Sequence, residues 1–185
     1  TRLSIIDRAK GKQPFTDDET NSSLVANAEI YNYQDLKLDL IAQGVRFKTN
    51  SDCEVILHGY LLYGTSFFKK LNGIFAFALW DARRDILLLA RDSSGVKPLY
   101  YRYNNGEIIF ASEIKAISKL EVSSNIDETG LYDFLFWRYI PSNRTIFAGI
   151  SKLNAGELLV YEDKKISRSF FKSAEFRPSC DFDIF

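Results

Sequence analysis

The chain has 185 residues, with 24 Lys and Arg against 24 Asp and Glu, so its formal net charge is zero. This balance argues against a general nucleic-acid-binding protein, because such proteins need surplus cationic side chains to displace counterions. Apolar residues make up 46% and aromatic residues 15% of the chain, which indicates a globular domain whose core is built on large rings.

The cysteines and the hydropathy pattern indicate a cytoplasmic protein. Cys53 and Cys180 are too few for a disulfide scaffold, which favours a reduced setting. No stretch approaches the roughly 18 apolar residues of a membrane span, and no signal peptide is evident. One histidine, His58, and two scattered cysteines predict no metal site. The chain has no Met and opens mid-pattern on Thr1, so we expect a fragment or a processed chain.

The first part of the chain predicts short strands followed by helices. Asn32 is expected to cap the first helix, because its side-chain oxygen can accept from the free amides of the first turn. Gly44 ends that helix. In chain order, the pattern predicts strands over residues 3–7 and 24–30, helices from 32 to 44 and from 50 to 64, and a short helix over 65–71.

From residue 73 onward, the apolar pattern changes to period two or to continuous apolar runs, which indicates strands. Four consecutive strands of one antiparallel sheet are predicted. The aromatic run Tyr132–Tyr139 is expected to face the core, with an exposed docking stripe as the alternative. This order indicates antiparallel sheet with helices stacked outside it. The predicted elements are strands over 74–80, 86–91, 99–103 and 107–111, helices over 113–120 and 128–139 with Asp127 as cap, and a hairpin over 157–161 and 167–171.

Short sequence blocks follow one another in a fixed order between residues 2 and 171; they include residues 2–7, 27–32, 51–54, 71–78 and 95–101. Six or more ordered blocks make a specific match. They resemble the glutaminase domain of glutamine-hydrolysing asparagine synthetases, which are class II glutamine amidotransferases. The resemblance implies an α+β fold, a four-layer αββα N-terminal-nucleophile sandwich of two antiparallel sheets, here truncated at its N-terminus. Residues 1–172 are assigned to this domain, and residues 173–185 form an unassigned tail.

The same resemblance implies hydrolysis of the glutamine side-chain amide, with the ammonia passed to a synthetase domain in cis. The attacking cysteine of the family lies upstream of Thr1, so the fragment alone is predicted to be inactive. This domain is expected to need no cofactor, whereas ATP and Mg are expected in the synthetase domain. Glutamine is the expected ligand, with no nucleic acid and no membrane as partners. The sequence leaves open which carboxylate accepts the ammonia and whether the protein forms a homodimer.

A free glutamine carries charges at one end and a neutral amide at the other. Its carboxylate needs a planar cationic fork, which Arg2 can offer, and its ammonium needs an anion such as Asp52. The attacked carbonyl oxygen becomes negative and needs hydrogen-bond donors. The resemblance assigns that oxyanion role to the Asn27 side chain and the Ala28 backbone amide. By the same resemblance, the pocket is also lined by Leu3, Ser4, Ile5, Ile6 and Glu29.

Residue 28 departs from the family, which has glycine there. With a positive φ, Ala28 costs on the order of 1 kcal/mol and tilts its amide; with a negative φ, it only adds a methyl group. The absent cysteine and Ala28 leave an alternative open, a non-catalytic glutamine-binding or interaction module of the same fold. Arg2 and Asp52 could also be plain surface charges. Cys53 is expected to be a buried apolar side chain, His58 a packed or surface residue, and residues 92–97 a turn rather than a phosphate loop.

Overall fold

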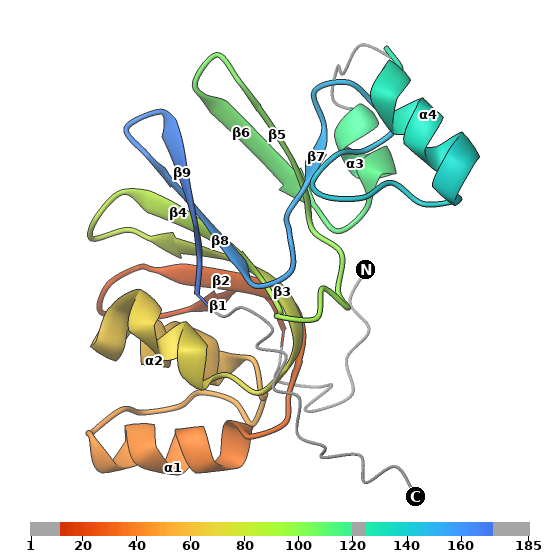
Figure 1. Ribbon diagram of the computed structural model, residues 1–185. Helices are drawn as coiled ribbons and strands as arrows, with labels where there is room; N and C mark the ends of the chain where they lie inside the picture. The colour runs from red at the N-terminus through yellow and green to blue at the C-terminus, as the bar shows by residue number, and fades with distance from the viewer. Residues whose placement is uncertain (1–11, 120–124, 172–185) are drawn as a thin grey trace, which may run out of the picture.

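Two antiparallel sheets form the centre of the protein, as the computed structural model shows for residues 12–119 and 125–171 (Figure 1). The larger sheet has the strand order β1-β2-β3-β4-β8-β9 and the smaller one the order β6-β5-β7. The predicted α+β class with two antiparallel sheets is therefore confirmed. The strands are β1 Phe15–Thr16, β2 Ser23–Ile30, β3 Gly73–Asp81, β4 Ile86–Arg91, β5 Tyr100–Asn104, β6 Glu107–Ala111, β7 Ser151–Lys152, β8 Glu157–Glu162 and β9 Lys165–Phe170.

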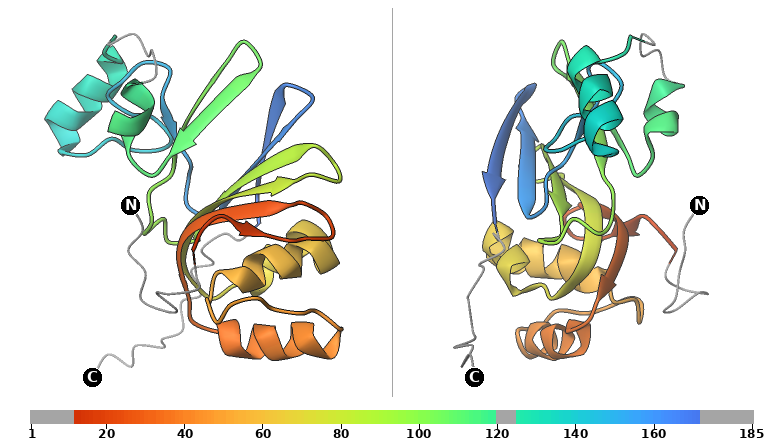
Figure 2. Two further views of the ribbon diagram at one scale, coloured as in Figure 1. Left: turned by 180° about the vertical axis from the view of Figure 1, so that it is seen from behind. Right: turned by 45° about the vertical axis from the view of Figure 1, so that its right-hand side comes forward.

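Helices lie at both ends of the molecule. Below the larger sheet in Figure 1 are α1 (Tyr33–Ala42) and α2 (Glu54–Tyr63), which continues into the 3-10 helix η1 (Gly64–Lys70). At the opposite end, beside the smaller sheet, are α3 (Ile114–Ser118) and α4 (Glu128–Trp137), as both views of Figure 2 also show. Among the described residues, no helix is both long enough and apolar enough to cross a membrane.

The β3 strand separates two cores, which explains its continuous apolar sequence. Successive side chains of a strand point to opposite faces. On one face, Phe75 and Phe77 pack under the helices with Phe68, whose ring centroid lies 5.1 Å from that of Phe77. On the other face, Ala76 and Ala78 pack against the smaller sheet. The buried phenylalanines of β3 thus lie in the core between the helices and the larger sheet, whereas Ala76 and Ala78 face the second core.

The four consecutive strands predicted to form one sheet are divided between two sheets, so that prediction is wrong. The β3–β4 hairpin belongs to the larger sheet and the β5–β6 hairpin to the smaller one. The chain is redirected after β4, where the Arg91 guanidinium donates to the carbonyl oxygens of Lys97 and Leu153, each at 2.7 Å. The contact with Leu153 joins residues 62 positions apart in the sequence, so strand periodicity could not predict it.

The prediction that the Asn32 side chain caps the first helix is also wrong. Its Oδ1 accepts from the backbone N of Asn72 at 3.0 Å, and its Nδ2 donates to the carbonyl oxygen of Lys70 at 2.9 Å. Asn32 therefore ties the start of α1 to the connection between η1 and β3. The Asp127 cap is confirmed, since its Oδ1 accepts from the backbone N of Gly130 at 2.6 Å.

The aromatic side chains of α4 do not face the core, contrary to the sequence prediction. Tyr132, Phe136 and Trp137 are 66%, 65% and 56% exposed. Gly130 is the one buried residue of this helix. A Cβ placed on Gly130 would lie 2.5 Å from the carbonyl oxygen of Thr145, so the helix approaches the rest of the protein closely only at its first turns.

Replacing Gly59 with Ala should destabilise the protein by roughly 2–3 kcal/mol, because overpacking a filled core forces neighbouring groups to move. A Cβ at Gly59 would overlap the ring of the buried Phe67. Gly44→Ala is the matched control. Its Cβ meets nothing within 4 Å, so only the φ of +90° is unfavourable, at about 1 kcal/mol. Equilibrium urea unfolding should show a larger loss of unfolding free energy in Gly59→Ala than in Gly44→Ala. Equal losses in the two variants would contradict the packing argument.

Candidate functional site

Among the described residues, side chains rather than a long neighbouring strand bond to the outer edge of β2. The β1 strand pairs with only two of its residues, Ser23 and Leu24. Next along the edge, the Gln13 side-chain amide replaces a strand: its Nε2 donates to the carbonyl oxygen of Ala26 and its Oε1 accepts from the Ala26 N, both at 2.8 Å. At the end of the strand, Asp52 Oδ2 accepts from the Ile30 N at 2.9 Å.

Ala28 lies on this edge between Gln13 and Asp52, and its backbone amide faces outward. In an antiparallel ladder, residues opposite each other alternately exchange both backbone hydrogen bonds or none. Ala28 is opposite Phe75. Phe75 bonds instead to Asp92, donating to its Oδ2 at 3.2 Å and accepting from its backbone N at 2.8 Å. The Ala28 N–H therefore points away from β3, and within residues 12–119 and 125–171 no acceptor meets it.

The backbone at Ala28 decides between the two alternatives that the sequence left open. Ala28 lies in a regular strand and is absent from the residues with positive φ. Its methyl group packs against the core beneath the helices. Alanine therefore brings no left-handed strain here, and the direction of the amide is set by the β2–β3 ladder.

Asn27 and Glu29 project from the opposite face of β2, because side chains alternate along a strand. Asn27 is exposed and immediately precedes the outward Ala28 amide. Glu29 is half-buried, and its Oε1 lies 3.5 Å from the Nζ of Lys97. The end of β2 thus presents a carboxamide, a backbone N–H and a carboxylate on consecutive residues.

Asp52 reaches the same end of β2 from the segment that precedes α2. It is 4% exposed, and its Oδ1 lies 3.7 Å from the Sγ of Cys53. Cys53 itself is 2% exposed, so the prediction of a buried cysteine is confirmed. Of the predicted site residues, the structure brings Asn27, Ala28, Glu29 and Asp52 to one strand end. The others lie outside the described residues, namely Arg2, Leu3, Ser4, Ile5 and Ile6.

Glu54 fixes the segment that carries Asp52. Its carboxylate accepts from the backbone N of Lys48 and of Thr49, both at 2.8 Å, and lies 3.2 Å from the Nε2 of His58. Burial works to raise the pKa of Glu54, but hydrogen bonds from His58, Thr49 and these backbone amides outweigh it and lower that pKa to about 2. Glu54 is therefore a charged anchor at the start of α2, and His58 is a packed histidine, as predicted.

Lys97 is a residue of this region that sequence reasoning did not single out. The stretch from Ser93 to Lys97 is a turn, as predicted, with Gly95 at a φ of +63°. The turn also places a cation beside Glu29 on β2. No sequence signal connects these two residues, because the pairing arises only when the chain turns between the two sheets.

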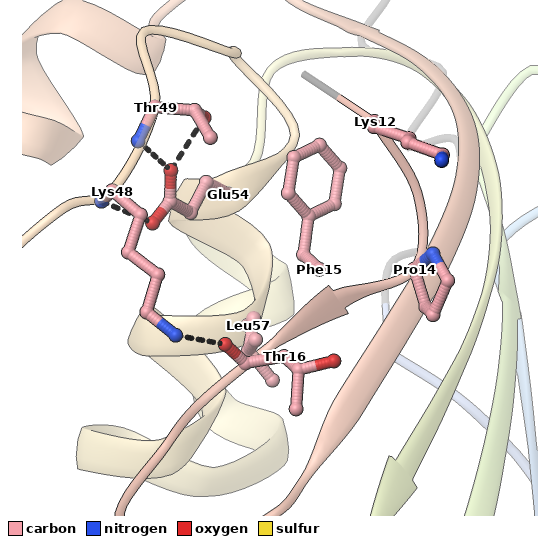
Figure 3. Close-up of a pocket in the computed structure, with 8 residues that line it drawn as sticks. All are labelled: Lys12, Pro14, Phe15, Thr16, Lys48, Thr49, Glu54 and Leu57. Carbon is pink, nitrogen blue, oxygen red and sulfur yellow. Dashed lines mark hydrogen bonds between the residues drawn. The ribbon is translucent and has the colours of Figure 1, made fainter. Parts of the chain in front are cut away.

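A hollow of about 410 Å³ lies on the helix side of the larger sheet, beside the start of α2 (Figure 3). Two of its charged groups already have partners: the Glu54 carboxylate accepts from the backbone N of residues 48 and 49, and the Lys48 Nζ donates to the carbonyl oxygen of Thr16 at 2.8 Å. We assign it no ligand, and it is separate from the end of β2. Its lining residues are Lys12, Pro14, Phe15, Thr16, Lys48, Thr49, Glu54 and Leu57.

Comparison with known proteins identifies the family of the domain. The family model for the glutamine amidotransferase domain matches residues 1–172. Asparagine synthetase [glutamine-hydrolyzing] 1 of Bacillus subtilis (strain 168) is 36% identical over 178 residues, which is 96% of this chain and 28% of that protein. Amidase chry2 of Gibberella zeae is 39% identical over 160 residues, covering 86% of this chain and 23% of that protein. The chain thus spans about a quarter of the length of these relatives.

Solved structures agree with the fold. The glutamine phosphoribosylpyrophosphate (PRPP) amidotransferase from B. subtilis has a TM-score of 0.61 at 21% identity, over 86% of this chain and 32% of that chain. A structure described as the allosteric regulatory enzyme of purine biosynthesis has a TM-score of 0.62 at 21% identity, over 88% and 32% of the respective chains. At this identity the likeness concerns the fold alone.

The protein should lose stability in acid through Glu54. Its folded pKa of about 2 lies below the ordinary value of 4.5, so the stabilisation is complete above roughly pH 5 and is lost as the pH falls toward 2. At roughly 1.4 kcal/mol per pKa unit, the loss is on the order of 3 kcal/mol at most. Urea unfolding between pH 2 and 6 should show the free energy of unfolding falling as the pH falls. In Glu54→Gln, this dependence on pH should be weaker. The exposed Glu162→Gln is the control, and an unchanged slope in Glu54→Gln would contradict the assignment.

Proposed function

The chain belongs to the glutamine amidotransferase domain family, and on that premise we propose that it is the glutaminase domain of an asparagine synthetase-like ligase. It hydrolyses the side-chain amide of glutamine and supplies the ammonia to the ligase. The observation that carries this proposal is the outward N–H of Ala28 beside the Asn27 carboxamide, at the end of β2 to which Asp52 is bonded.

The two donors suit the charge that develops in amide hydrolysis. A nucleophile adds to the amide carbon, the carbonyl oxygen becomes negative, the carbon–nitrogen bond breaks and ammonia leaves. Water then releases glutamate from the acyl intermediate. The Ala28 N–H is oriented by the β2–β3 ladder, so it needs no rearrangement when the negative charge forms, and the Asn27 Nδ2 supplies a second donor from the neighbouring residue. The nucleophile in this proposal is the N-terminal cysteine of the mature protein, with its own α-amino group as base.

Asp52 is proposed to receive the α-ammonium of glutamine. A buried carboxylate that accepts one backbone hydrogen bond retains further acceptor sites. A charge-assisted bond to an ammonium is roughly twice as strong as a neutral one. Arg2 is proposed to bind the substrate carboxylate, with Leu3, Ser4, Ile5 and Ile6 lining the pocket; these five assignments rest on the sequence resemblance.

The whole protein is proposed to be larger than this domain and cytoplasmic. The relatives named as glutamine-hydrolysing asparagine synthetases extend well beyond the matched region, which is 28% and 27% of two of them. We assign the remaining part to a synthetase domain in cis that uses ATP and Mg to amidate aspartate or a related carboxylate.

The natural gene product, purified with its own N-terminus, should release glutamate and ammonia from glutamine. The 185-residue chain by itself should show no turnover, because the proposed nucleophile is not one of its residues. A coupled glutamate assay on the two proteins tests both expectations. Absence of glutaminase activity and of glutamine binding in the gene product would reject the function, and turnover by the chain alone would reject the nucleophile assignment.

Replacing Asn27 with Ala in that gene product should lower kcat about 10²- to 10³-fold, as expected for the loss of one oxyanion donor. The KM for glutamine should change much less, because this donor acts mainly on the developing charge. Val25→Thr is the matched control, since Val25 is exposed on the same face of β2. If steady-state kinetics show a comparable loss of kcat in both variants, the loss comes from disturbance of the β2 strand and not from removal of the Asn27 carboxamide.

A further inference from the structure

We propose that Lys97 is a positioning residue for substrate binding: its ammonium orients Glu29, whose carboxylate then accepts the α-ammonium of glutamine together with Asp52. This inference rests on the proposed function and deepens it. It starts from the ion pair between the Lys97 Nζ and the Glu29 Oε1, which are 3.5 Å apart.

The backbone of Lys97 is held from both sides. Its N–H donates to Asp92 Oδ2 at 3.2 Å, and its carbonyl oxygen accepts from the Arg91 Nε at 2.7 Å. Asp92 also accepts from the backbone N of Val96 at 3.0 Å. Asp92 and Arg91 are themselves 1% and 9% exposed, so they are fixed in the protein interior. The Lys97 side chain therefore starts from a defined point beside β2.

This ion pair contributes little to folding, which argues for another role. The side chains of Lys97 and Glu29 are 23% and 38% exposed. Ion pairs that reach solvent typically contribute about 0–1 kcal/mol to stability. The pair nevertheless lies next to the two proposed oxyanion donors, because Glu29 directly follows Ala28 on β2.

The charges at the end of β2 fit an ammonium ligand only when Lys97 is included. Glu29 and Asp52 are two carboxylates at one strand end, since Asp52 is bonded to the N–H of Ile30, the residue after Glu29. Like charges placed together repel each other. Of the charges that the structure describes at this strand end, Lys97 offsets one carboxylate and leaves one net negative charge for the single ammonium of glutamine. It also engages Oε1 of Glu29, which leaves Oε2 to accept from the ligand.

The test uses the full-length gene product and two substrates, glutamine and 4-carbamoylbutanoate, which is glutamine without its α-amino group. Lys97→Met should raise the KM for glutamine about tenfold, a loss of about 1.4 kcal/mol, with kcat within about twofold of wild type. The KM for 4-carbamoylbutanoate should not change, because that substrate has no ammonium for Glu29 to bind. Lys97→Arg should restore the wild-type KM for glutamine.

Two further variants complete the experiment. Lys115→Met is the matched control, since Lys115 forms an exposed ion pair with Glu113 at 2.5 Å outside the site. The Glu29→Gln/Lys97→Met double variant should bind glutamine no worse than Glu29→Gln, because Lys97 acts through Glu29. An equal rise in KM for both substrates would overturn the proposal, and so would an unchanged KM in Lys97→Met. A wild-type protein without glutamine turnover or binding would instead reject the proposed function, and this inference with it.

Discussion

Asp92 is the residue on which the geometry of the site depends. Its carboxylate accepts from the backbone N of Phe75, and its own backbone N donates to the Phe75 carbonyl oxygen, so it bonds both backbone groups of the residue opposite Ala28. The same carboxylate accepts from the backbone of Val96 and Lys97 and so shapes the turn between the two sheets. One buried acidic residue therefore joins the strand opposite Ala28 to the turn that carries the Lys97 cation.

The second constraint is that, in the part of the chain that the structure describes, polar side chains bond to the outer edge of β2. An edge strand carries unpaired backbone groups that attract other chains. Here the Gln13 amide satisfies both groups of Ala26, and Asp52 satisfies the N–H of Ile30. Glu54 in turn holds the segment that presents Asp52. The edge is bonded on either side of Ala28, while within residues 12–119 and 125–171 no acceptor meets the Ala28 N–H.

Local sequence signals predicted the elements of the fold better than their assembly. Strand periodicity identified β2 and the β3–β4 hairpin, and the ordered blocks predicted the two-sheet class. The division of four strands between two sheets depends on Arg91 bonding to Leu153, a contact that no local pattern encodes. For the site, the resemblance pointed to Asn27 and Asp52, which the structure brings to one strand end. Lys97 was missed because its partner lies in a distant part of the chain.

The exposed rings of α4 affect how this protein behaves in solution. Phe134, Leu135 and Phe136 lie on a helix of which, among its described residues, only the glycine is buried. On one face of this helix, the exposed rings of Tyr132 and Phe136 stack with their centroids 6.3 Å apart, and exposed apolar surface promotes self-association. The isolated chain should therefore remain monomeric only when dilute, and hydrophobic dyes should bind it even in the native state.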